Sequence, residues 1–321
     1  MARAESDRRV TTTTAAPDVS IVVPCYGRGD MLLECLRSIV AQEFQDWEAI
    51  VVDDGTPTTE VQDRVRRVSD RRIRYIRHLR NLGPSAARNT GFKAARADVI
   101  VSVDSDDSLD PSFLRVTLAA LDADPTTDGV FTDFQLFGDS DDVRYQRVRS
   151  LRELLLENWI PGSGTLQRKR IWERVGGYCE RRDLTAEDWD FWIGASERGL
   201  KVQHIPGPLY RYREHRDSIT AERWSSEYRL RELIYARHRR KFDDEGLGAQ
   251  FRAAGYFASS VGYLRAGRHV RSARLALHAA LLEPGNRRFR RHLAVSLLPE
   301  TLVTRRRERR RRAQRSEVPA R

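Results

Sequence analysis

The chain has 321 residues, 40% of them hydrophobic, which is enough apolar material for a core and excludes a globally disordered protein. It contains no apolar run of about 18 residues, the length that a membrane-spanning helix needs, and residues 1–18 lack the apolar segment of a secretory signal. The three cysteines, Cys25, Cys35 and Cys179, do not have metal-ligand spacing. We therefore expect a cytoplasmic protein with reduced thiols, either soluble or peripherally attached at the inner face of a membrane.

The formal net charge of +11 is concentrated at the C-terminus. Residues 305–321 hold nine arginines and two acidic residues, Glu308 and Glu317, a net contribution of +7. Such a run is typical of a disordered tail, and an anionic membrane surface would attract it by about 1 kcal/mol per basic residue. Nucleic-acid binding through the tail is an alternative, which the lack of a basic and aromatic motif in the rest of the chain disfavours.

Strand and helix patterns alternate between Val19 and Phe137. Apolar runs of the kind found in buried parallel strands occupy residues 19–23, 49–52, 73–76 and 99–103. Helices are expected after Asp30, from Pro84 to about Arg96, and after Asp110-Pro111. This alternation predicts an α/β fold with a mostly parallel, doubly wound sheet.

The rest of the chain divides by pattern into three parts. Residues 138–221 lose the alternation and are rich in loops, glycines and aromatic residues. Residues 222–300 show helical apolar spacing and predict a helical C-terminal subdomain, with helices expected at 228–240, 251–264 and 270–282. Residues 1–18 and 301–321 are expected to be a flexible N-terminal segment and an Arg-rich disordered tail.

Polar or glycine-containing segments follow each predicted strand, and in open α/β sheets ligands bind at the carboxyl ends of the strands. The four segments are Pro24-Cys25-Tyr26-Gly27-Arg28, Asp53-Asp54-Gly55, the stretch from Asn81 to Asn89, and Asp104-Ser105-Asp106-Asp107. We therefore expect a ligand site at this edge of the sheet.

Asp104 and Asp106 are one residue apart directly after a buried strand, where both carboxylates can face one small hard cation. Mg²⁺ and Mn²⁺ prefer oxygen ligands and share them with substrate phosphates. The alternative is an acidic turn that caps the following helix, but Asp110 lies closer to that helix and is the better capping candidate. The position of the two aspartates at a strand end favours a metal site that would stabilise a departing diphosphate.

Asp53 follows the second strand, where an acidic residue can accept hydrogen bonds from a base or a ribose. An Asp-Gly turn explains Asp54-Gly55 but not two consecutive aspartates. Arg88 lies on a helix that begins near the site, so it is a candidate contact to base or phosphate, and an outward-facing salt bridge is the competing interpretation.

A dinucleotide-binding dehydrogenase is excluded by the glycine pattern. Gly27 and Gly29 follow the first strand, but the third glycine of that fingerprint would fall at position 32, which is Leu32.

Together these segments resemble the inverting family 2 glycosyltransferases of the GT-A fold. Four blocks match that pattern in order and spacing, and the match covers about residues 19–220: Val19 to Tyr26, Ile50 to Gly55, Asn81 to Asn89, and Val103 to Asp107. The resemblance implies a nucleotide-sugar-binding half at 19–137 and an acceptor-binding, catalytic half at 138–221.

The resemblance also implies roles for individual residues. Asp104 would contact the ribose or the metal ion, Asp106 would bind the Mn²⁺ or Mg²⁺ ion directly, and Asp53 would contact the base. The full set of expected donor-binding residues is Pro24, Cys25, Tyr26, Arg28, Asp53, Asp54, Gly83, Arg88, Asp104 and Ser105.

The catalytic base of such enzymes lies in an acidic pair after a glycine-rich turn. Here Gly176-Gly177-Tyr178 precedes Glu187-Asp188-Trp189, which implies Asp188 as the base that deprotonates the acceptor hydroxyl, with Glu187 beside it. A helix N-terminal cap is the alternative for this pair, and both roles are compatible.

His215, in a segment similar to the family's late arginine–histidine region, is a candidate third metal ligand, with a plain surface histidine as the competing interpretation. The family's processive synthases carry a Q-x-x-R-W motif, whereas this chain has Thr220 before Arg223-Trp224. A non-processive transferase is therefore expected.

The implied reaction moves a sugar, with a UDP-sugar as the favoured donor, to a glycan or lipid-linked acceptor in cell-wall, lipid-linked or exopolysaccharide synthesis. A catalytically silent nucleotide-sugar-binding scaffold is the alternative from another class of protein, and the intact Glu187-Asp188 pair counts against it.

Overall fold

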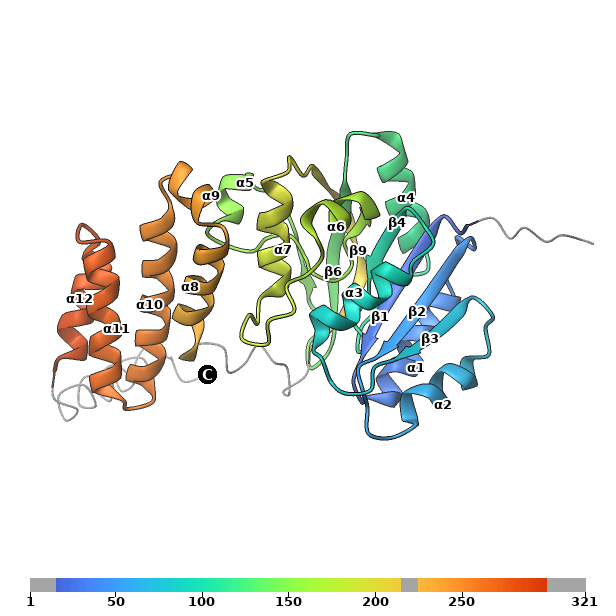
Figure 1. The fold of residues 1–321 in the computed structure, drawn as a ribbon, viewed down its shortest axis with the longest axis horizontal. Coiled ribbons are helices and arrows are strands. Elements are labelled where there is room, and N and C mark those ends of the chain that lie inside the picture. The colour runs from blue at the N-terminus through green and yellow to red at the C-terminus, as the bar shows by residue number, and fades with distance from the viewer. Residues whose placement is uncertain (1–15, 215–224, 299–321) are drawn as a thin grey trace, which may run out of the picture.

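The computed structural model describes residues 16–214 and 225–298 (Figure 1). The expected flexible N-terminal segment falls almost entirely outside the described residues, and His215, Thr220, Arg223, Trp224 and the Arg-rich tail lie outside them as well. No helix in the two described ranges combines the length and the apolar character needed to cross a bilayer.

One twisted sheet runs through the described part of the chain, with the strand order β3-β2-β1-β4-β8-β6-β9-β5 and with β7 paired to β6. The bounds are β1 Val19–Cys25, β2 Trp47–Asp53, β3 Ile73–Arg77, β4 Val99–Ser102, β5 Ser108–Leu109, β6 Gly129–Gly138, β7 Val143–Arg144, β8 Leu166–Arg168 and β9 Val202–Glu214. The first four strands are mutually parallel, as the sequence predicts. β8 is antiparallel to both β4 and β6, and β9 is parallel to β6, so strands from residues 138–214 extend the same sheet.

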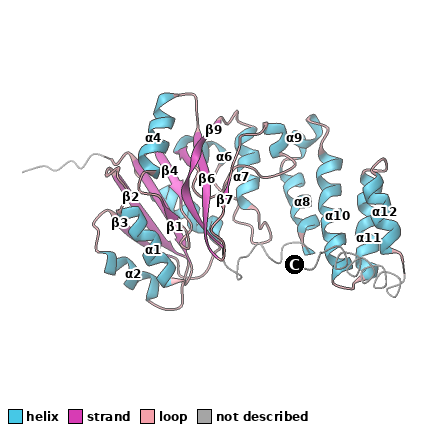
Figure 2. Cartoon of the chain, turned by 180° about the vertical axis from the view of Figure 1, so that it is seen from behind, coloured by secondary structure: helices cyan, strands magenta, loops and turns pink. Residues whose placement is uncertain are grey.

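Helices cover both faces of this sheet and continue beyond it as a row (Figures 1 and 2). Their bounds are α1 Gly29–Val40, α2 Glu60–Val68, α3 Pro84–Ala94, α4 Phe113–Ala123, α5 Leu151–Leu154, α6 Lys169–Val175, α7 Glu187–Ser196, α8 Glu227–Arg237, α9 Arg239–Asp244, α10 Gly248–Arg265, α11 His269–Leu282 and α12 Arg287–Ser296.

Side chains of β1 point alternately to the two faces of the sheet, which explains why helices pack on both faces. Val19, Ile21 and Val23 belong to a core with residues of α1, α2 and α4, whereas Val22 packs in a second core with residues of α3, α6 and α7. Because successive residues of a strand point to opposite faces, an uninterrupted apolar run must be buried on both sides. This places the ends of the strands, and not their faces, in reach of a ligand.

The C-terminal helices are joined to the rest through the second core. Phe251 of α10 packs against Trp189 of α7, with ring centroids 5.3 Å apart, and Leu230 of α8 lies in the same cluster. Ala253, Ala279 and Phe289 form a small core of their own between α10, α11 and α12.

Three expected helix boundaries differ in the structure. The helix expected after Asp110-Pro111 begins at Phe113 with Ser112 as its N-cap, so Asp110 does not occupy the N-cap position. The helix expected at 228–240 is interrupted at His238, whose ring lies 3.0 Å from both Asp190 and Glu197 and whose backbone leaves the helical region. The first helix begins at Gly29, before Asp30, after a left-handed Arg28, so Asp30 lies in its first turn and does not cap it.

Candidate active site

The predicted ligand edge is formed by the ends of β1, β2 and β4 together with the first turns of α3 and α7. Asp104, Ser105 and Asp106 follow β4, while Glu187 and Asp188 open α7. The structure therefore brings the acidic loop and the acidic pair to one place, although more than eighty residues separate them in the chain.

Arg88 on α3 joins these two acidic groups. Its Nη1 donates to Glu187 Oε1 at 2.6 Å, its Nη2 donates to Asp104 Oδ1 at 3.0 Å, and its Nε donates to Ser102 Oγ at 3.3 Å. The side chain is buried, which opposes its charge, but Asp104 and Glu187 raise the pKa of its guanidinium well above the ordinary value. Arg88 thus points inward between two carboxylates, and the outward-facing salt bridge considered from the sequence is wrong.

Asp107 anchors the loop after β4 to strand β9 by hydrogen bonds. Its buried carboxylate accepts hydrogen bonds from the Arg213 backbone N–H at 2.8 Å and from the Tyr210 hydroxyl at 2.7 Å. Burial, and then the charge of Asp104, raise the pKa of Asp107 well above its usual range. Asp107 is not among the site residues predicted from the sequence. The one feature of the sequence that marks it is its place as the third aspartate in residues 104–107.

The two outer carboxylates of this loop stay within reach of solvent. The side chains of Asp104 and Asp106 are 34% and 19% exposed, and Asp106 pairs with the Arg28 guanidinium. Arg213 also donates to the Asp106 carbonyl oxygen at 2.7 Å, so β9 and the loop are tied together.

The described residues contain no group of three or more metal-binding side chains, and His215 lies outside them. Two carboxylates one residue apart nevertheless fit Mg²⁺ or Mn²⁺, because such ions are commonly held by one or two carboxylates plus substrate phosphates. The all-oxygen chemistry of Asp104 and Asp106 agrees with that preference.

The two aspartates after β2 have different surroundings. Asp53 is buried and accepts from the Thr56 N–H at 2.9 Å and the Tyr75 hydroxyl at 2.6 Å. Asp54 accepts from His78 and from the N–H groups of Leu82 and Gly83, at 2.7, 2.9 and 2.7 Å. The Asp54 carboxylate therefore holds the loop that leads into α3, and a donor contact by either aspartate stays a prediction.

The segment after β1 combines a buried and an exposed side chain. The Cys25 thiol donates to the Gly27 carbonyl oxygen at 3.1 Å, and burial raises its pKa to about 12, so it stays protonated. The Tyr26 ring is about half exposed at the ligand edge. Pro24 continues β1, and Ser105 is buried beside the Cys25 thiol.

Both carboxylate oxygens of Asp188 accept hydrogen bonds. Its Oδ2 accepts from Asn158 Nδ2 at 2.9 Å and its Oδ1 accepts from the Trp189 N–H at 2.8 Å. Gly162 lies against it so closely that an added Cβ would be 2.7 Å from the Asp188 Cβ. Asn158 and Gly162 were not expected from the sequence, because nothing local marks them. The N-cap residue of α7 is Ala186, so neither Glu187 nor Asp188 occupies the N-cap position, although Asp188 accepts from an N–H group of the first turn.

Asn89, the neighbour of Arg88 on α3, forms hydrogen bonds with the glycine-rich turn at residues 176–178. Its Oδ1 accepts from Trp172 Nε1 at 3.0 Å and the Tyr178 N–H at 2.8 Å, while its Nδ2 donates to the Tyr178 carbonyl at 2.8 Å. Gly177 has φ +86°, and a Cβ there would lie 2.8 Å from Asn89 Oδ1. Two adjacent residues of α3 thus position both the acidic pair and the turn before it.

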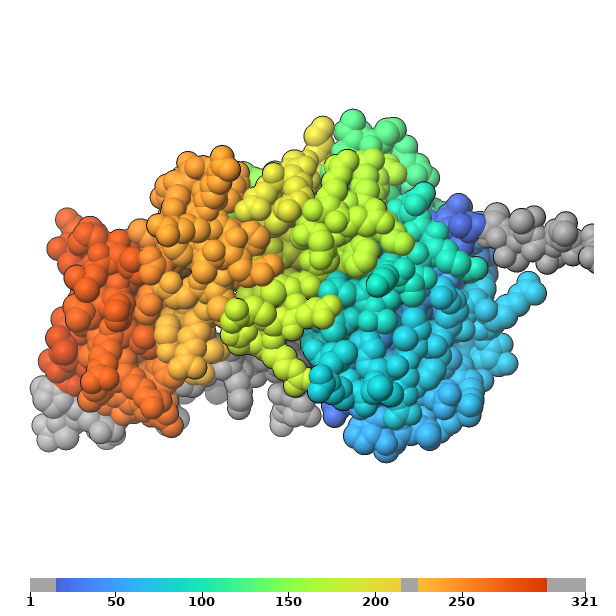
Figure 3. Space-filling view, in the orientation of Figure 1, coloured from blue at the N-terminus to red at the C-terminus, as the bar shows by residue number. Residues whose placement is uncertain are grey.

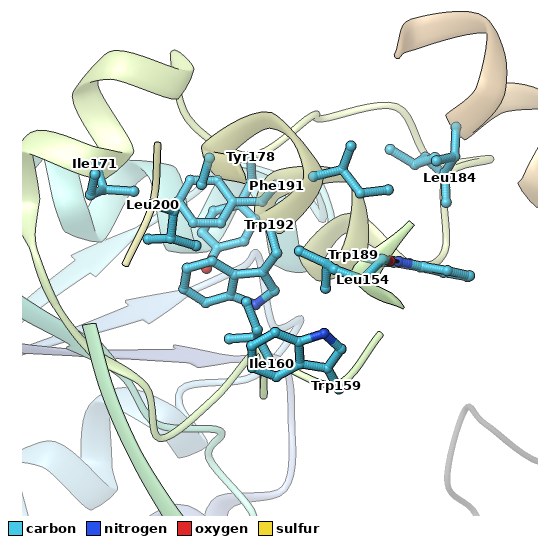
Figure 4. Close-up of a cluster of buried hydrophobic side chains, with 14 of the residues drawn as sticks. Leu154, Trp159, Ile160, Ile171, Tyr178, Leu184, Trp189, Phe191, Trp192 and Leu200 are labelled. Carbon is cyan, nitrogen blue, oxygen red and sulfur yellow. Dashed lines mark hydrogen bonds between the residues drawn. The ribbon is translucent and has the colours of Figure 1, made fainter. Parts of the chain in front are cut away.

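An aromatic core packs around the residues of α7 that follow the acidic pair (Figure 4). Tyr178 and Phe191 stack with ring centroids 4.5 Å apart, Phe191 meets Trp192 edge-on at 4.8 Å, and Trp189 Nε1 donates to the Leu154 carbonyl at 2.6 Å. Large interlocking rings leave α7 little freedom, so its first turn is a rigid platform for Glu187 and Asp188.

Solved structures define the class of fold. S. aureus TarS 1-349, in complex with UDP-GlcNAc, superposes with a TM-score of 0.64 at 16% identity over 87% of this chain and 90% of that one. The mannosyltransferase PcManGT from Pyrobaculum calidifontis, in complex with GDP-Man and Mn²⁺, superposes with a TM-score of 0.56 at 20% identity over 88% and 85%. The fold is that of the GT-A glycosyltransferases.

Sequence comparison then gives the family. The model of glycosyl transferase family 2 matches residues 20–180, and the chain belongs to that family of enzymes. The chain is 32% identical over 220 residues to EpsJ, an uncharacterized glycosyltransferase of Bacillus subtilis, covering 64% of this chain and 63% of EpsJ. It is 40% identical over 111 residues to the succinoglycan biosynthesis protein ExoO of Rhizobium meliloti, covering 33% and 30%. The chain thus spans less than two thirds of the length of these relatives.

Proposed function

We propose that this chain is a metal-dependent, inverting, non-processive glycosyltransferase that moves a hexosyl or N-acetylhexosaminyl group from a nucleotide-diphosphate-sugar to an acceptor hydroxyl. The contact that carries the proposal is the double ion pair of Arg88, which sets Asp104 of the donor loop and Glu187 of the acidic pair on either side of one guanidinium. Donor and acceptor groups must meet within a few ångströms for transfer, and the closeness of Asp104 and Glu187 to one guanidinium supports such a site.

The donor would bind along the strand ends. Tyr26 offers an exposed ring to the base, and Asp53, Arg28, Gly83 and Ser105 are among the other residues proposed for the donor-binding edge. A UDP-sugar is the favoured donor, and the solved complex of TarS with UDP-GlcNAc supports this choice by fold alone. The PcManGT complex, which contains GDP-Man, makes GDP the first competitor to test.

Asp106 and Asp104 would hold a divalent cation, with His215 as a proposed third ligand. When bound, the cation would offset the negative charge that builds up on the departing diphosphate. Arg28, paired with Asp106, lies beside the same position and adds positive charge there.

Asp188 would act as general base. Its carboxylate takes the proton of the acceptor hydroxyl while that oxygen bonds to the anomeric carbon, and the bond from that carbon to the diphosphate breaks on the opposite face. Asn158 and the Trp189 N–H orient the carboxylate, and Glu187, engaged by Arg88, is the weaker candidate for this step.

The acceptor is proposed to be a glycan or a lipid-linked glycan in cell-wall, lipid-linked or exopolysaccharide synthesis, as the name of ExoO suggests. We place the reaction at the cytoplasmic face of the membrane. Non-processive transfer follows from the incomplete Q-x-x-R-W motif at Thr220.

A thermal-shift panel of UDP, GDP, dTDP and CMP, each with and without Mn²⁺, tests the donor and metal sites together. A ligand at one hundred times its Kd adds about 2.7 kcal/mol to the stability, so one nucleotide should raise the Tm only when Mn²⁺ is present, and Asp106→Ala should abolish the shift. No shift with any nucleotide would contradict the proposal.

Turnover separates an enzyme from a silent scaffold. Asp188→Asn should keep the metal-dependent nucleotide shift and lower turnover by about 10²- to 10⁴-fold, the usual contribution of a general base. Nucleotide binding without any turnover in the wild-type protein would favour the scaffold instead.

A further inference from the structure

The last two helices expose an unusual amount of apolar surface. Within the two described ranges, eight large hydrophobic side chains are strongly exposed, and four of them lie in α11 and at the end of α12. These four are Val270, Leu277, Leu281 and Leu297, with exposures of 68%, 47%, 68% and 68%. Exposed apolar side chains that gather in one place mark an interaction surface.

The α11 members form a stripe along one helix face. Val270, Arg274, Leu277 and Leu281 follow the i, i+4, i+7, i+11 spacing of residues that lie above one another. The opposite face of α11 carries Ser272, Ala276 and Ala279, which are buried against the neighbouring helices. The stripe therefore points away from the protein, and the helices lie at one end of the molecule (Figure 3).

Arginines accompany the stripe. Arg268, Arg271 and Arg274, together with Val270 and Leu297, line a groove of about 890 Å³ between the beginning of α11 and the end of α12. Within the described part of the chain no carboxylate forms an ion pair with these three arginines. The Arg271 guanidinium lies over the ring of Tyr263 on α10, 5.8 Å from its centroid. Residues 265–298 contain eight arginines and a single acidic residue, Glu283.

The basic helices α8 and α9 differ in this respect. Arg231, Arg237 and Arg239 pair with Glu227, Asp190 and Asp243 at 2.9, 2.7 and 3.3 Å. Lys241 pairs with Glu245 in the same way. Their charge is largely neutralised within the fold, so these two helices offer little free charge to an anionic surface. Among the residues that the structure describes, the arginines without an ion pair are concentrated on α11 and α12 instead.

We propose that the face formed by Val270, Arg271, Arg274, Leu277, Leu281 and Leu297 binds an anionic lipid surface. Leucine and valine side chains would enter the boundary between headgroups and acyl chains, while the arginines contact lipid phosphates and keep their apolar stems at the surface. A second copy packing face to face would bring like charges together. A nucleic acid would be expected to use stacking rings where this face has aliphatic side chains.

Vesicle co-sedimentation of the full-length protein tests this surface. Binding is expected to vesicles of phosphatidylcholine with phosphatidylglycerol and not to phosphatidylcholine alone. Leu277→Ser/Leu281→Ser should lower the partition coefficient about tenfold or more, because two inserted side chains are lost. Arg271→Glu/Arg274→Glu should lower it as well. Tyr145→Ser/Val148→Ser, at two exposed apolar side chains elsewhere, is the matched control and should bind like the wild type.

All these variants keep the Arg-rich tail, so its contribution cancels in the comparison. The proposal is overturned if the Leu277/Leu281 variant binds as well as the wild type, or if both vesicle types bind equally. It is also overturned if sedimentation without vesicles shows a dimer that this variant dissolves, or if the face binds RNA and the variant abolishes that binding. None of these outcomes bears on the transferase proposal, since the face lies outside the candidate active site.

Discussion

Arg88 Nη1 lies 2.6 Å from Glu187 Oε1, and the two residues are 99 positions apart in the chain. The same guanidinium reaches Asp104 at 3.0 Å. A single buried cation therefore links the loop proposed to hold the donor with the helix proposed to hold the base, so a change at Arg88 should disturb both groups at once.

Arg88→Lys tests this link. A lysine carries one compact charge and cannot reproduce two divergent contacts, so one carboxylate should lose its partner. We expect kcat/KM to fall by about two orders of magnitude and the stability to fall by about 3 kcal/mol, the range for a broken buried pair. Turnover and chemical denaturation measure the two effects. Arg115→Ala, which breaks an exposed pair with Glu43, should change stability by less than about 1 kcal/mol.

Asn158→Leu should act on the chemical step. The variant removes the hydrogen bond to Asp188 Oδ2 and keeps a similar volume, so the carboxylate loses its orientation while the donor edge is unaffected. We expect kcat to fall about tenfold with little change in donor KM, as for an interaction that matters mainly in the transition state. A rise in donor KM at constant kcat would assign Asn158 to donor binding instead.

Gly162→Ala should be harmful because space, and not backbone conformation, is limiting there. The new Cβ would meet Asp188 at 2.7 Å, which forces either the side chain or the loop to move. Overpacking of this kind costs about 1–3 kcal/mol, and displacement of the proposed base should lower turnover as well. Gly285→Ala is the matched control, since a Cβ there meets nothing within 4 Å. Equal Tm and turnover in the two variants would contradict the close approach.

His238 should make part of the stability depend on pH. Burial disfavours its charge, but the hydrogen bonds to Asp190 and Glu197 prevail and raise its pKa. A raised pKa contributes stability that is fully present below the unfolded value near 6.5 and is lost as pH rises through the folded value. The Tm difference between wild type and His238→Gln should therefore be largest at about pH 5.5 and smaller at about pH 9. A difference that does not change with pH would show that His238 is neutral in the fold.

The parallel sheet was predictable from the sequence, and so were the polar segments at its strand ends, whose role as a ligand edge stays a prediction. Uninterrupted apolar runs such as Val19–Val23 and Ala49–Val52 need burial on both faces, and glycine or acidic residues directly after them identify the strand ends. These signals are local, because each depends on the properties of a few consecutive residues.

The partners within the site were decided by the tertiary structure. Each of the main hydrogen bonds in the site joins residues from different elements. Arg88 donates to Asp104 and Glu187, Asn158 donates to Asp188, and Tyr210 donates to Asp107. The extension of the sheet by β8 and β9 and the exposed stripe on α11 also depend on how distant segments pack together. Residue patterns along the chain set which segments become strands and helices, whereas a hydrogen bond or an exposed face depends on which distant segments pack together, and that is determined only when the whole core forms.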